Sequence, residues 1–251
     1  MAGEQPPLEP RAPPDRVIYA IGDVHGRLDL LERLVSRIHD DIQVHGRPYD
    51  LIFLGDYIDR GPRSRGVLDC LNALKPADAT ASSSIILLRG NHEQALLDFL
   101  EDPEKGAPWL QHGGLQTLSD YGVHLASAPA DAASLLMVRD EFAHAFPTIH
   151  RDLLAGLPLT AQRGDYLFVH AGVRPGVSLE DQKAHDLLWI RREFLERPTG
   201  LRVVVVHGHT PTEAPEVRRW RIGVDTGAYA TGVLTAVRLA DERQDFIQTG
   251  V

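Results

Sequence analysis

The motif GDYIDRG at residues 55–61 constrains this chain more than any other stretch. The apolar run at 51–54 ends at Gly55, and Asp56, Asp59 and Arg60 follow it. A short apolar run bounded by turn residues is typical of a buried strand. In an α/β sheet, polar groups just past such a strand lie in the crevice at its carboxyl edge. The alternative is a strand that ends in solvent among ordinary loop residues, and four other strand ends argue against it.

Each of these four predicted strands also ends beside residues that can bind a metal. Asp23 and His25 follow the strand at 17–21, Asn91 and His92 follow 85–88, His170 follows 166–169, and His209 follows 203–206. Because the carboxyl ends of parallel strands meet at one edge, we expect these side chains to lie close together.

The residue types at these strand ends predict a metal centre. A mixture of oxygen and nitrogen ligands suits Mn²⁺, Fe or Zn²⁺ better than Ca²⁺. Cys70 is the single cysteine, which argues against a structural zinc site. Two metal ions that share a carboxylate can activate a bridging hydroxide for attack on phosphorus. Asp56 is the natural shared ligand, because it lies in the central motif.

The remaining pattern predicts one domain over 17–251. Apolar residues at helical spacing between 28 and 42 link the first two strands into a β-α-β unit with a parallel pair. We expect a hairpin from 153–159 and 166–169, a helix over 179–196, and antiparallel strands at 217–224, 233–239 and 245–248. Residues 102–150 lose the strand–helix rhythm, and we interpret them as a helical insertion over the active site. This insertion is either a substrate lid or a purely structural subdomain.

Charge and composition limit the partners of the chain. The net charge of −9 disfavours binding to nucleic acid or to an anionic membrane surface. Residues 1–16 contain five prolines and no apolar run, so we expect a flexible leader rather than a signal peptide. A single cysteine suits a reducing compartment, and we expect a soluble cytoplasmic protein. Its oligomeric state does not follow from the sequence.

Five motifs, taken in order, resemble those of the phosphoprotein-phosphatase family of calcineurin-like metallophosphoesterases. They are GDVHG at 22–26, GDYIDRG at 55–61, GNHE at 90–93, HAG at 170–172 and HGHT at 207–210. The resemblance spans residues 17–237 and is closest to compact bacterial and phage protein phosphatases and to symmetrical diadenosine tetraphosphate hydrolases. Stretches 109–114 and 117–122 are similar to those relatives too. The family resemblance implies an α/β (α+β) fold, namely an αββα sandwich of two mixed sheets flanked by helices.

The resemblance also implies a role for each motif residue. Asp23, His25 and Asp56 would hold the first metal ion, and Asp56, Asn91, His170 and His209 the second. His92 would be the general acid, and the carboxylate of Asp59 would stabilise its imidazolium form. Arg60 would bind phosphate oxygens, as would Arg191, with the adjacent Arg192 as the alternative. Manganese is the metal that the family suggests.

Three further residues have two interpretations each. Arg174 is close enough to His170 in the chain to bind substrate, but it is equally compatible with a surface loop charge. His207 either supports a metal ligand or is satisfied in the core. Asp225 either braces the site or serves a turn.

The sequence therefore predicts a dinuclear-metal phosphatase that hydrolyses phosphomonoesters, with phosphoserine and phosphothreonine proteins as the leading substrates. The alternative is symmetrical hydrolysis of diadenosine tetraphosphate at the same site. A binding module without activity is disfavoured because every expected catalytic residue is present. A nuclease is disfavoured by the acidic balance.

Overall fold

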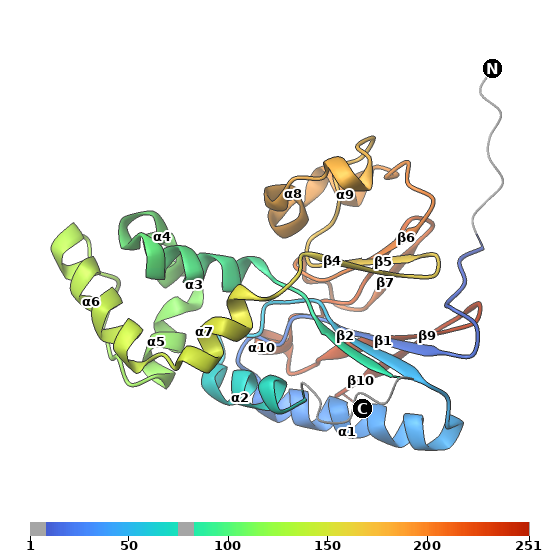
Figure 1. Ribbon diagram of the computed structural model, residues 1–251, viewed down its shortest axis with the longest axis horizontal. Helices are drawn as coiled ribbons and strands as arrows, with labels where there is room; N and C mark the ends of the chain where they lie inside the picture. The colour runs from blue at the N-terminus through green and yellow to red at the C-terminus, as the bar shows by residue number, and fades with distance from the viewer. Residues whose placement is uncertain (1–8, 75–82, 251) are drawn as a thin grey trace.

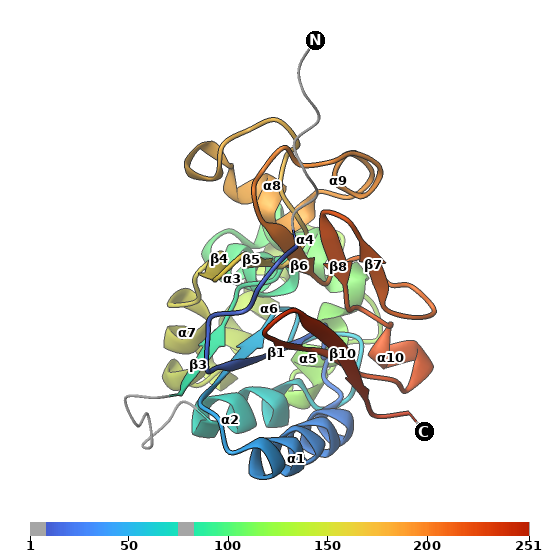
Figure 2. The ribbon, with the colours of Figure 1, turned by 90° about the vertical axis from the view of Figure 1, so that its right-hand side faces the viewer.

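The computed structural model describes residues 9–74 and 83–250 of the chain. Two five-stranded sheets stack face to face, and helices cover their outer faces (Figures 1 and 2). This helix–sheet–sheet–helix order confirms the expected αββα sandwich. Among the described residues, no helix is long and apolar enough to cross a membrane.

The first sheet has the strand order β10-β9-β1-β2-β3. Its strands are β1 (Val17–Ile21), β2 (Tyr49–Phe53), β3 (Ser84–Leu87), β9 (Thr235–Ala240) and β10 (Arg243–Gln248). The first three strands are parallel, as expected, and β9 and β10 complete the sheet as an antiparallel edge. Helices α1 (Leu28–His45) and α2 (Ser64–Leu74) cover its outer face.

The second sheet has the order β4-β5-β6-β8-β7. Its strands are β4 (Thr160–Arg163), β5 (Tyr166–Val169), β6 (Val204–His207), β7 (Glu216–Arg218) and β8 (Arg221–Gly223). Strands β5, β6 and β8 are parallel. The 3₁₀ turn η2 (Leu179–Asp181) precedes α8 (Ala184–Trp189) and α9 (Arg192–Glu196), which lie on the outer face, and α10 (Ala228–Thr231) follows β8.

Strand β1 shows why the central strands are apolar throughout. Ile18 and Ala20 pack between the sheets, while Val17, Tyr19 and Ile21 pack in the core under the helices. Successive side chains of a strand point to opposite faces, so a strand covered on both faces needs a continuous apolar run. The carboxyl ends of these buried strands are therefore the places where polar residues can gather.

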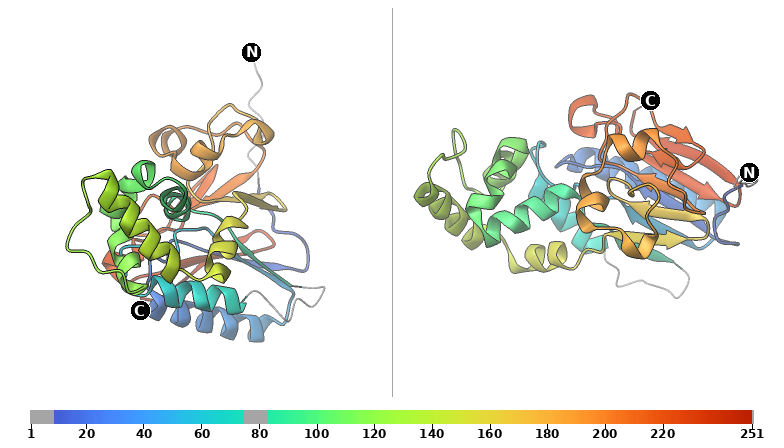
Figure 3. Two further views of the ribbon diagram at one scale, coloured as in Figure 1. Left: turned by 60° about the vertical axis from the view of Figure 1, so that its left-hand side comes forward. Right: turned by 90° about the horizontal axis from the view of Figure 1, so that it is seen from above.

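Five helices and one kinked turn follow β3 and project beside the sandwich (Figures 1 and 3). They are α3 (Asn91–Glu101), α4 (Pro103–Trp109), η1 (Leu110–Gly114), α5 (Leu115–Asp120), α6 (Ala132–Ala145) and α7 (Thr148–Ala155). They start at the carboxyl end of β3, so the predicted insertion at 102–150 lies next to the predicted site. Its action as a lid stays a prediction.

Three local predictions were wrong. The single strand expected at 217–224 is a hairpin of β7 and β8, which pair antiparallel around a turn at 219–220. The hairpin partner of β5 is β4 rather than residues 153–159, because Leu153, Leu154 and Leu157 face one apolar core from the end of a helix and the turn after it. The predicted helix over 179–196 is broken at Ile190, whose extended backbone (φ −61°, ψ 141°) separates α8 from α9. This break turns Arg191 toward the site.

Residues 9–16 of the predicted leader contact both sheets, and residues 1–8 lie outside the described residues. The amide of Ala12 donates to the carbonyl of Asp241, at the turn between β9 and β10. The carbonyl of Arg11 accepts from the amide of Asp165, at the turn between β4 and β5. This segment therefore ties together the ends of the two sheets opposite the predicted site.

Candidate metal centre

The predicted metal ligands come together from the strand ends of both sheets. Asp23 and His25 follow β1, Asp56 follows β2, Asn91 begins α3 after β3, His170 follows β5, and His209 follows β6. Every one of them is buried, with an exposed fraction of at most 4%. The carboxyl ends of the parallel strands in the two stacked sheets thus converge on one polar centre within an apolar sandwich.

The backbone at this centre is strained. Five site residues adopt a positive φ, which L-residues rarely do: His25 (46°), Asp56 (53°), Asp59 (73°), Arg60 (65°) and His209 (63°). The only other such non-glycine residues in the described chain are Asp15 and Asp241. Each conformation of this kind costs on the order of 1–3 kcal/mol. Strain concentrated here indicates that the fold holds these side chains in orientations that the chain would not adopt locally.

Asp56 lies between two groups of possible metal ligands. Its Oδ2 is 3.5 Å from His25 Nε2 and 3.8 Å from His92 Nε2. Its Oδ1 is 3.4 Å from His170 Nε2, and His209 completes that second group. Each carboxylate oxygen therefore faces one group, which is the arrangement that a ligand shared by two cations requires.

The second group has more acceptor atoms than donors. The Nδ1–H of His170 donates to the carbonyl of Leu54 at 2.9 Å, so its Nε2 carries a lone pair. That lone pair lies 2.8 Å from Asn91 Oδ1, which is another acceptor. His209 Nε2 is buried and has no hydrogen-bond partner among the described residues. Lone pairs that face one another in a buried site are compatible with a cation between them, so the residues present fit a metal ion.

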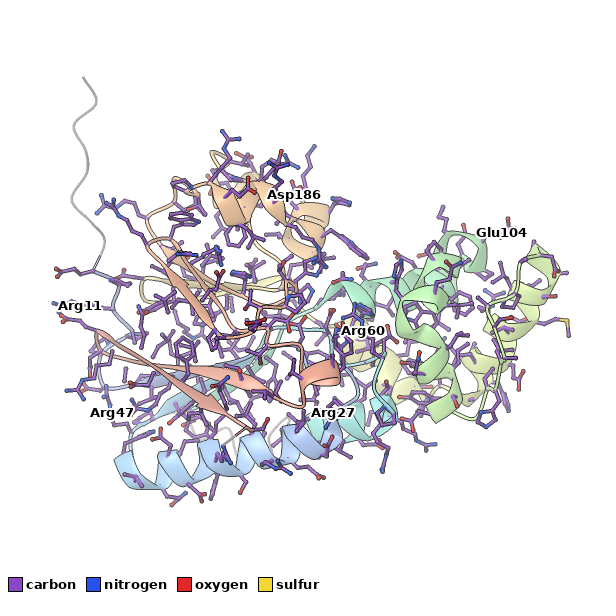
Figure 4. The ribbon with its side chains drawn as sticks, turned by 180° about the vertical axis from the view of Figure 1, so that it is seen from behind. Arg11, Arg27, Arg47, Arg60, Glu104 and Asp186 are labelled. Carbon is purple, nitrogen blue, oxygen red and sulfur yellow. The ribbon has the colours of Figure 1, made fainter. Side chains whose placement is uncertain are left out.

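The first group contains a protein cation. The guanidinium of Arg60 lies between two imidazoles, with Nη1 2.8 Å from His25 Nε2 and Nη2 3.0 Å from His92 Nε2. The ring of Tyr229 stacks on it at 4.7 Å. Figure 4 shows Arg60 where the sandwich meets the insertion. Nδ1 of His25 lies 2.8 Å from the carbonyl of Ile58, which leaves the lone pair on its Nε2. The guanidinium therefore contacts, on His25, a lone pair of the kind that a bound metal ion would take.

Asp23 is predicted to bind the first metal, but it stands apart from the two groups built around Asp56. Both of its oxygens lie 3.1 Å from the amide of His209. Burial, together with the charges of Asp225 and Asp56, raises the pKa of Asp23 well above its usual value. Asp225 is also buried, and its carboxyl group contacts that of Asp23 while its Oδ1 accepts from the amide of Gly227 at 2.9 Å, so it both lies beside the site and serves the turn. Three buried carboxylates near one another favour a positive ion.

The histidines of the centre differ in their affinity for protons. Burial lowers the pKa of His25 to about 3 and that of His209 to about 2, and it also lowers the pKa of His170. Burial alone would lower the pKa of His92 as well, but the charge of Asp56 and the hydrogen bond to Asp59 raise it to about 9. Neutral imidazoles bind metals and a protonated one donates a proton. The structure thus separates three possible ligands from one possible acid.

Asp59 is the residue that sets His92 apart. Its Oδ2 lies 2.6 Å from Nδ1 of His92, and the carboxylate is completely buried. Arg60 opposes protonation of His92 with one positive charge, whereas Asp56 and Asp59 favour it with two negative charges. The effect of the two carboxylates outweighs that of burial and of Arg60, so the pKa of His92 is raised.

Glu93 is a site residue that the sequence motif contained without an assigned role. Its carboxylate accepts hydrogen bonds from the amides of Asp56 (2.8 Å), Tyr57 (2.8 Å) and Gly90 (2.9 Å). It therefore joins the loop after β2 to the start of α3. Its place at the third position of a helix, where Glu caps free amides, is the signal that would have found it.

A cavity of about 430 Å³ opens beside His92. Four residues of the predicted site, Arg60, Asn91, His92 and Arg191, line one part of it, and Ala95, Asp98, Lys105, Gly106, Pro108, Trp109, His112 and Trp189 line the rest. The cavity therefore lies between the centre, the insertion and the end of α8. Trp189 is 41% exposed and meets His209 edge-on at 6.3 Å.

Three other predicted residues lie away from the cavity. Arg174 donates to Asp186 at 2.6 and 2.8 Å and to Glu193 at 2.8 Å. Figure 4 places Asp186 on α8, well apart from Arg60. The exposed Arg192 pairs with Glu196. His207 is satisfied in the core, 3.0 Å from the carbonyl of Gly208 and edge-on to Phe194. Of the candidate arginines, the structure brings Arg60 and Arg191 to the centre.

Sequence relatives of this chain are phosphatases and hydrolases. It is 25% identical to the asymmetrical bis(5'-nucleosyl)-tetraphosphatase PrpE of Bacillus velezensis, over 92% of each chain. It is 29% identical to serine/threonine-protein phosphatase 1 of Salmonella typhimurium, over 89% of this chain and 92% of that protein.

Solved structures share the fold. A provisionally named diadenosine tetraphosphatase superposes with a TM-score of 0.64 at 19% identity, over 93% of this chain and 94% of the other. A mutant of a cold-active protein tyrosine phosphatase gives a TM-score of 0.56 at 18% identity, over 99% of this chain and 85% of the other.

The sequence pattern of the calcineurin-like phosphoesterases matches residues 16–232. This match covers most of the chain, and it agrees with the two groups of possible ligands around Asp56. The protein therefore belongs to the calcineurin-like phosphoesterase family and is a metal-dependent hydrolase of phosphoric esters.

Proposed function

We propose that this protein hydrolyses phosphomonoesters, with phosphoserine and phosphothreonine side chains of proteins as its main substrates. The observation that carries the proposal is the placement of His92. It is bonded to a buried carboxylate on one side and faces Asp56, which both ligand groups share, on the other. A proton donor thus stands next to the position where a phosphate would bind.

Two divalent cations, for which we propose Mn²⁺, would be held by Asp23, His25 and Asp56 and by Asp56, Asn91, His170 and His209. When bound, they would supply an activated water as nucleophile and neutralise charge on the phosphate. Arg60 and Arg191 both line the cavity. Two guanidinium groups suit the dianionic terminal phosphate of a monoester, whose free oxygens accept bidentate hydrogen bonds.

The protonation step uses residues of this chain alone. As the bond between phosphorus and the leaving oxygen breaks, its electron pair goes to that oxygen, and Nε2 of His92 gives it a proton. Asp59 stabilises the imidazolium before the transfer. The attacking water gives its hydroxyl to phosphorus, and its proton replaces the one that His92 has lost, so that each turnover adds one water molecule across the ester bond.

The test is hydrolysis of a phosphothreonine peptide by protein stripped with a chelator and then restored with Mn²⁺. We expect no release of phosphate from the stripped protein and full release after restoration, with two metal ions bound per chain. Turnover that is unchanged by the chelator, or no turnover on any phosphate ester after restoration, would contradict the proposal.

The cavity favours a second candidate, hydrolysis of dinucleoside polyphosphates. The half-exposed ring of Trp189 offers a stacking surface for a base, and Lys105 adds a positive charge to the wall. The volume of about 430 Å³ lies within the range of small-molecule sites. Several relatives are named asymmetrical tetraphosphatases, so both cleavage patterns need testing. Diadenosine tetraphosphate would give ATP and AMP by asymmetrical cleavage, or two ADP by symmetrical cleavage.

The variant Trp189→Ala separates the two candidates. Stacking of one base on an aromatic ring contributes about 1–3 kcal/mol, so for a dinucleotide hydrolase we expect KM for diadenosine tetraphosphate to rise about tenfold or more. KM for 4-nitrophenyl phosphate should stay the same. An unchanged KM for the dinucleotide would remove Trp189 from substrate binding and with it the main support for this candidate.

A further inference from the structure

The carboxylate of Asp59 is held by the insertion and not only by its catalytic partner. Its Oδ2 accepts from Nε1 of Trp109 at 2.7 Å, in addition to Nδ1 of His92. Its Oδ1 accepts from Oγ1 of Thr117 at 2.5 Å. Both donors are neutral and come from residues 50 and 58 positions further along the chain. The orientation of this carboxylate is therefore fixed by a part of the fold that contains none of the proposed metal ligands.

The same contacts hold the backbone of Asp59. Its amide lies 3.0 Å from Oγ1 of Thr117 and 3.0 Å from Oγ of Ser64, and these two hydroxyls are 3.0 Å apart. Asp59 has a φ of 73°, a conformation that needs support from its surroundings. The insertion also touches the next residue, because the amide of Arg60 donates to the carbonyl of Gly113 at 3.3 Å.

Trp109 is itself held rigidly. Only 2% of its surface is exposed, and its ring packs between Phe99 of α3 and Phe142 of α6, at 5.2 and 6.0 Å. A Cβ on Gly114 would come within 2.7 Å of the indole, so the close contact there requires glycine. Indole has a single hydrogen-bond donor, and here it is directed at Asp59. The packing of the insertion thus determines where that donor points.

We propose that Trp109 and Thr117 are positioning residues: they hold Asp59 and, through it, the imidazole of His92 in the orientation that protonates the leaving oxygen. This inference rests on the proposed function, since it concerns the general acid of that reaction. It gives the insertion a part in catalysis that does not depend on lid motion. Misplacing a donor by about 1 Å is enough to weaken proton transfer strongly.

A positioning role has a kinetic signature that a purely structural role lacks. A general acid speeds the departure of a basic leaving group such as phenolate strongly, and that of a weakly basic one such as 4-nitrophenolate only a little. The ratio of kcat for phenyl phosphate to kcat for 4-nitrophenyl phosphate therefore reports on the acid. General loss of folded enzyme lowers both rates equally and leaves the ratio unchanged.

The test compares this ratio in Trp109→Phe and Thr117→Val, which remove one donor each while keeping most of the side-chain volume. We expect the ratio to fall about tenfold in each variant while KM stays within about twofold. Thr117→Ser, which keeps the hydroxyl, should have the same ratio as the wild-type protein. A ratio equal to that of the wild-type protein in both variants would overturn the proposal.

Matched controls are available elsewhere in the chain. Trp220→Phe removes an indole N–H that donates to a backbone carbonyl, that of Phe194, at 3.5 Å. Thr249→Val removes a buried hydroxyl near the end of β10. Neither should change the ratio.

A second measurement does not depend on turnover. In the full chain, both metal-free and loaded with diamagnetic Zn²⁺, the proton on Nδ1 of His92 should give a strongly downfield NMR resonance, identified by its loss in His92→Asn. We expect it to move upfield in Trp109→Phe and Thr117→Val and to stay in place in the two controls. If no ester is turned over, the proposed function fails and this resonance alone decides the inference. Its absence from the wild-type protein, or an unchanged position in both variants, would overturn it.

Discussion

His92 and His170 are two buried imidazoles that face the same carboxylate and differ in their second partner. Nε2 of each ring lies near an oxygen of Asp56, at 3.8 and 3.4 Å. Nδ1 of His92 meets the Asp59 carboxylate at 2.6 Å, whereas Nδ1 of His170 meets the carbonyl of Leu54 at 2.9 Å. The pKa of His92 rises to about 9 and that of His170 falls through burial. A charged rather than a neutral second partner therefore decides which ring keeps a proton and which offers a lone pair.

The largest expected effect comes from replacing each ring by asparagine. His92→Asn should lower kcat by about 10²–10⁴-fold, because it removes the general acid, and should leave two metal ions bound. His170→Asn should lower the affinity for one metal ion by more than about 100-fold, because losing even an indirect partner of a ligand costs 10–100-fold. Kinetics and metal analysis after dialysis measure both. Loss of metal from His92→Asn would contradict the distinction between His92 as proton donor and His170 as metal ligand.

The two rings should also give the metal-free protein opposite dependences of stability on pH. The His92 contribution is fully present below pH 6.5 and is lost as pH rises through about 9, and this difference is equivalent to about 3 kcal/mol. For His170 the pKa in the folded protein lies below the value of 6.5 in the unfolded chain. As pH falls below 6.5, the unfolded chain therefore binds a proton that the folded protein does not bind, and the free energy of unfolding decreases.

Chemical denaturation measures the free energy of unfolding between about pH 4 and 10, the range in which both rings change their protonation. The contribution of each ring is the difference between the wild-type protein and His92→Asn or His170→Asn at each pH. Equal slopes for the two variants would show that the second partner does not distinguish the rings.

The change Asp59→Asn tests the second partner directly. It replaces the charge beside His92 by a neutral amide of similar shape, so we expect the pKa of His92 to fall by about one to three units. An NMR titration of the metal-free protein measures this, and the pKa of His170 serves as the internal control. A His92 ring that still titrates near 9 would assign its proton affinity to Asp56 alone.

The smallest expected effect concerns two arginines, Arg191 and Arg174, which also have the same chemistry but different neighbours. Arg191 lines the cavity, whereas the guanidinium of Arg174 is held by Asp186 and Glu193. Arg191→Lys should raise KM for a phosphomonoester about tenfold, since it removes a charge-assisted hydrogen bond of about 1.5–3 kcal/mol. Arg174→Lys should change KM by less than about twofold. A large effect at Arg174 would mean that its ion pairs open when substrate binds.

Much of the centre could be predicted from strand ends and motifs. Asp56, His92 and His170 follow apolar runs that the sequence marks clearly as strands. The hairpin before β5 could not be placed correctly, because Leu153, Leu154 and Leu157 suit either a strand or the end of a helix when their packing partners are unknown. For the same reason the break at Ile190, which aims Arg191 at the cavity, was not visible in a run that reads as continuous helix.

The sequence alone determined which chemical groups are present and that the predicted metal ligands follow buried strands, because alternation and turn residues are local properties of the chain. Only the tertiary structure decided what each group does. Asp59 becomes the partner of His92 because Trp109 and Thr117, more than 45 residues away in the chain, direct their donors at it. Arg174 and Arg191 likewise differ in their neighbours and not in their chemistry. Proton affinity and orientation depend on burial and on nearby charges, and these are properties of the folded surroundings that no single stretch of sequence contains.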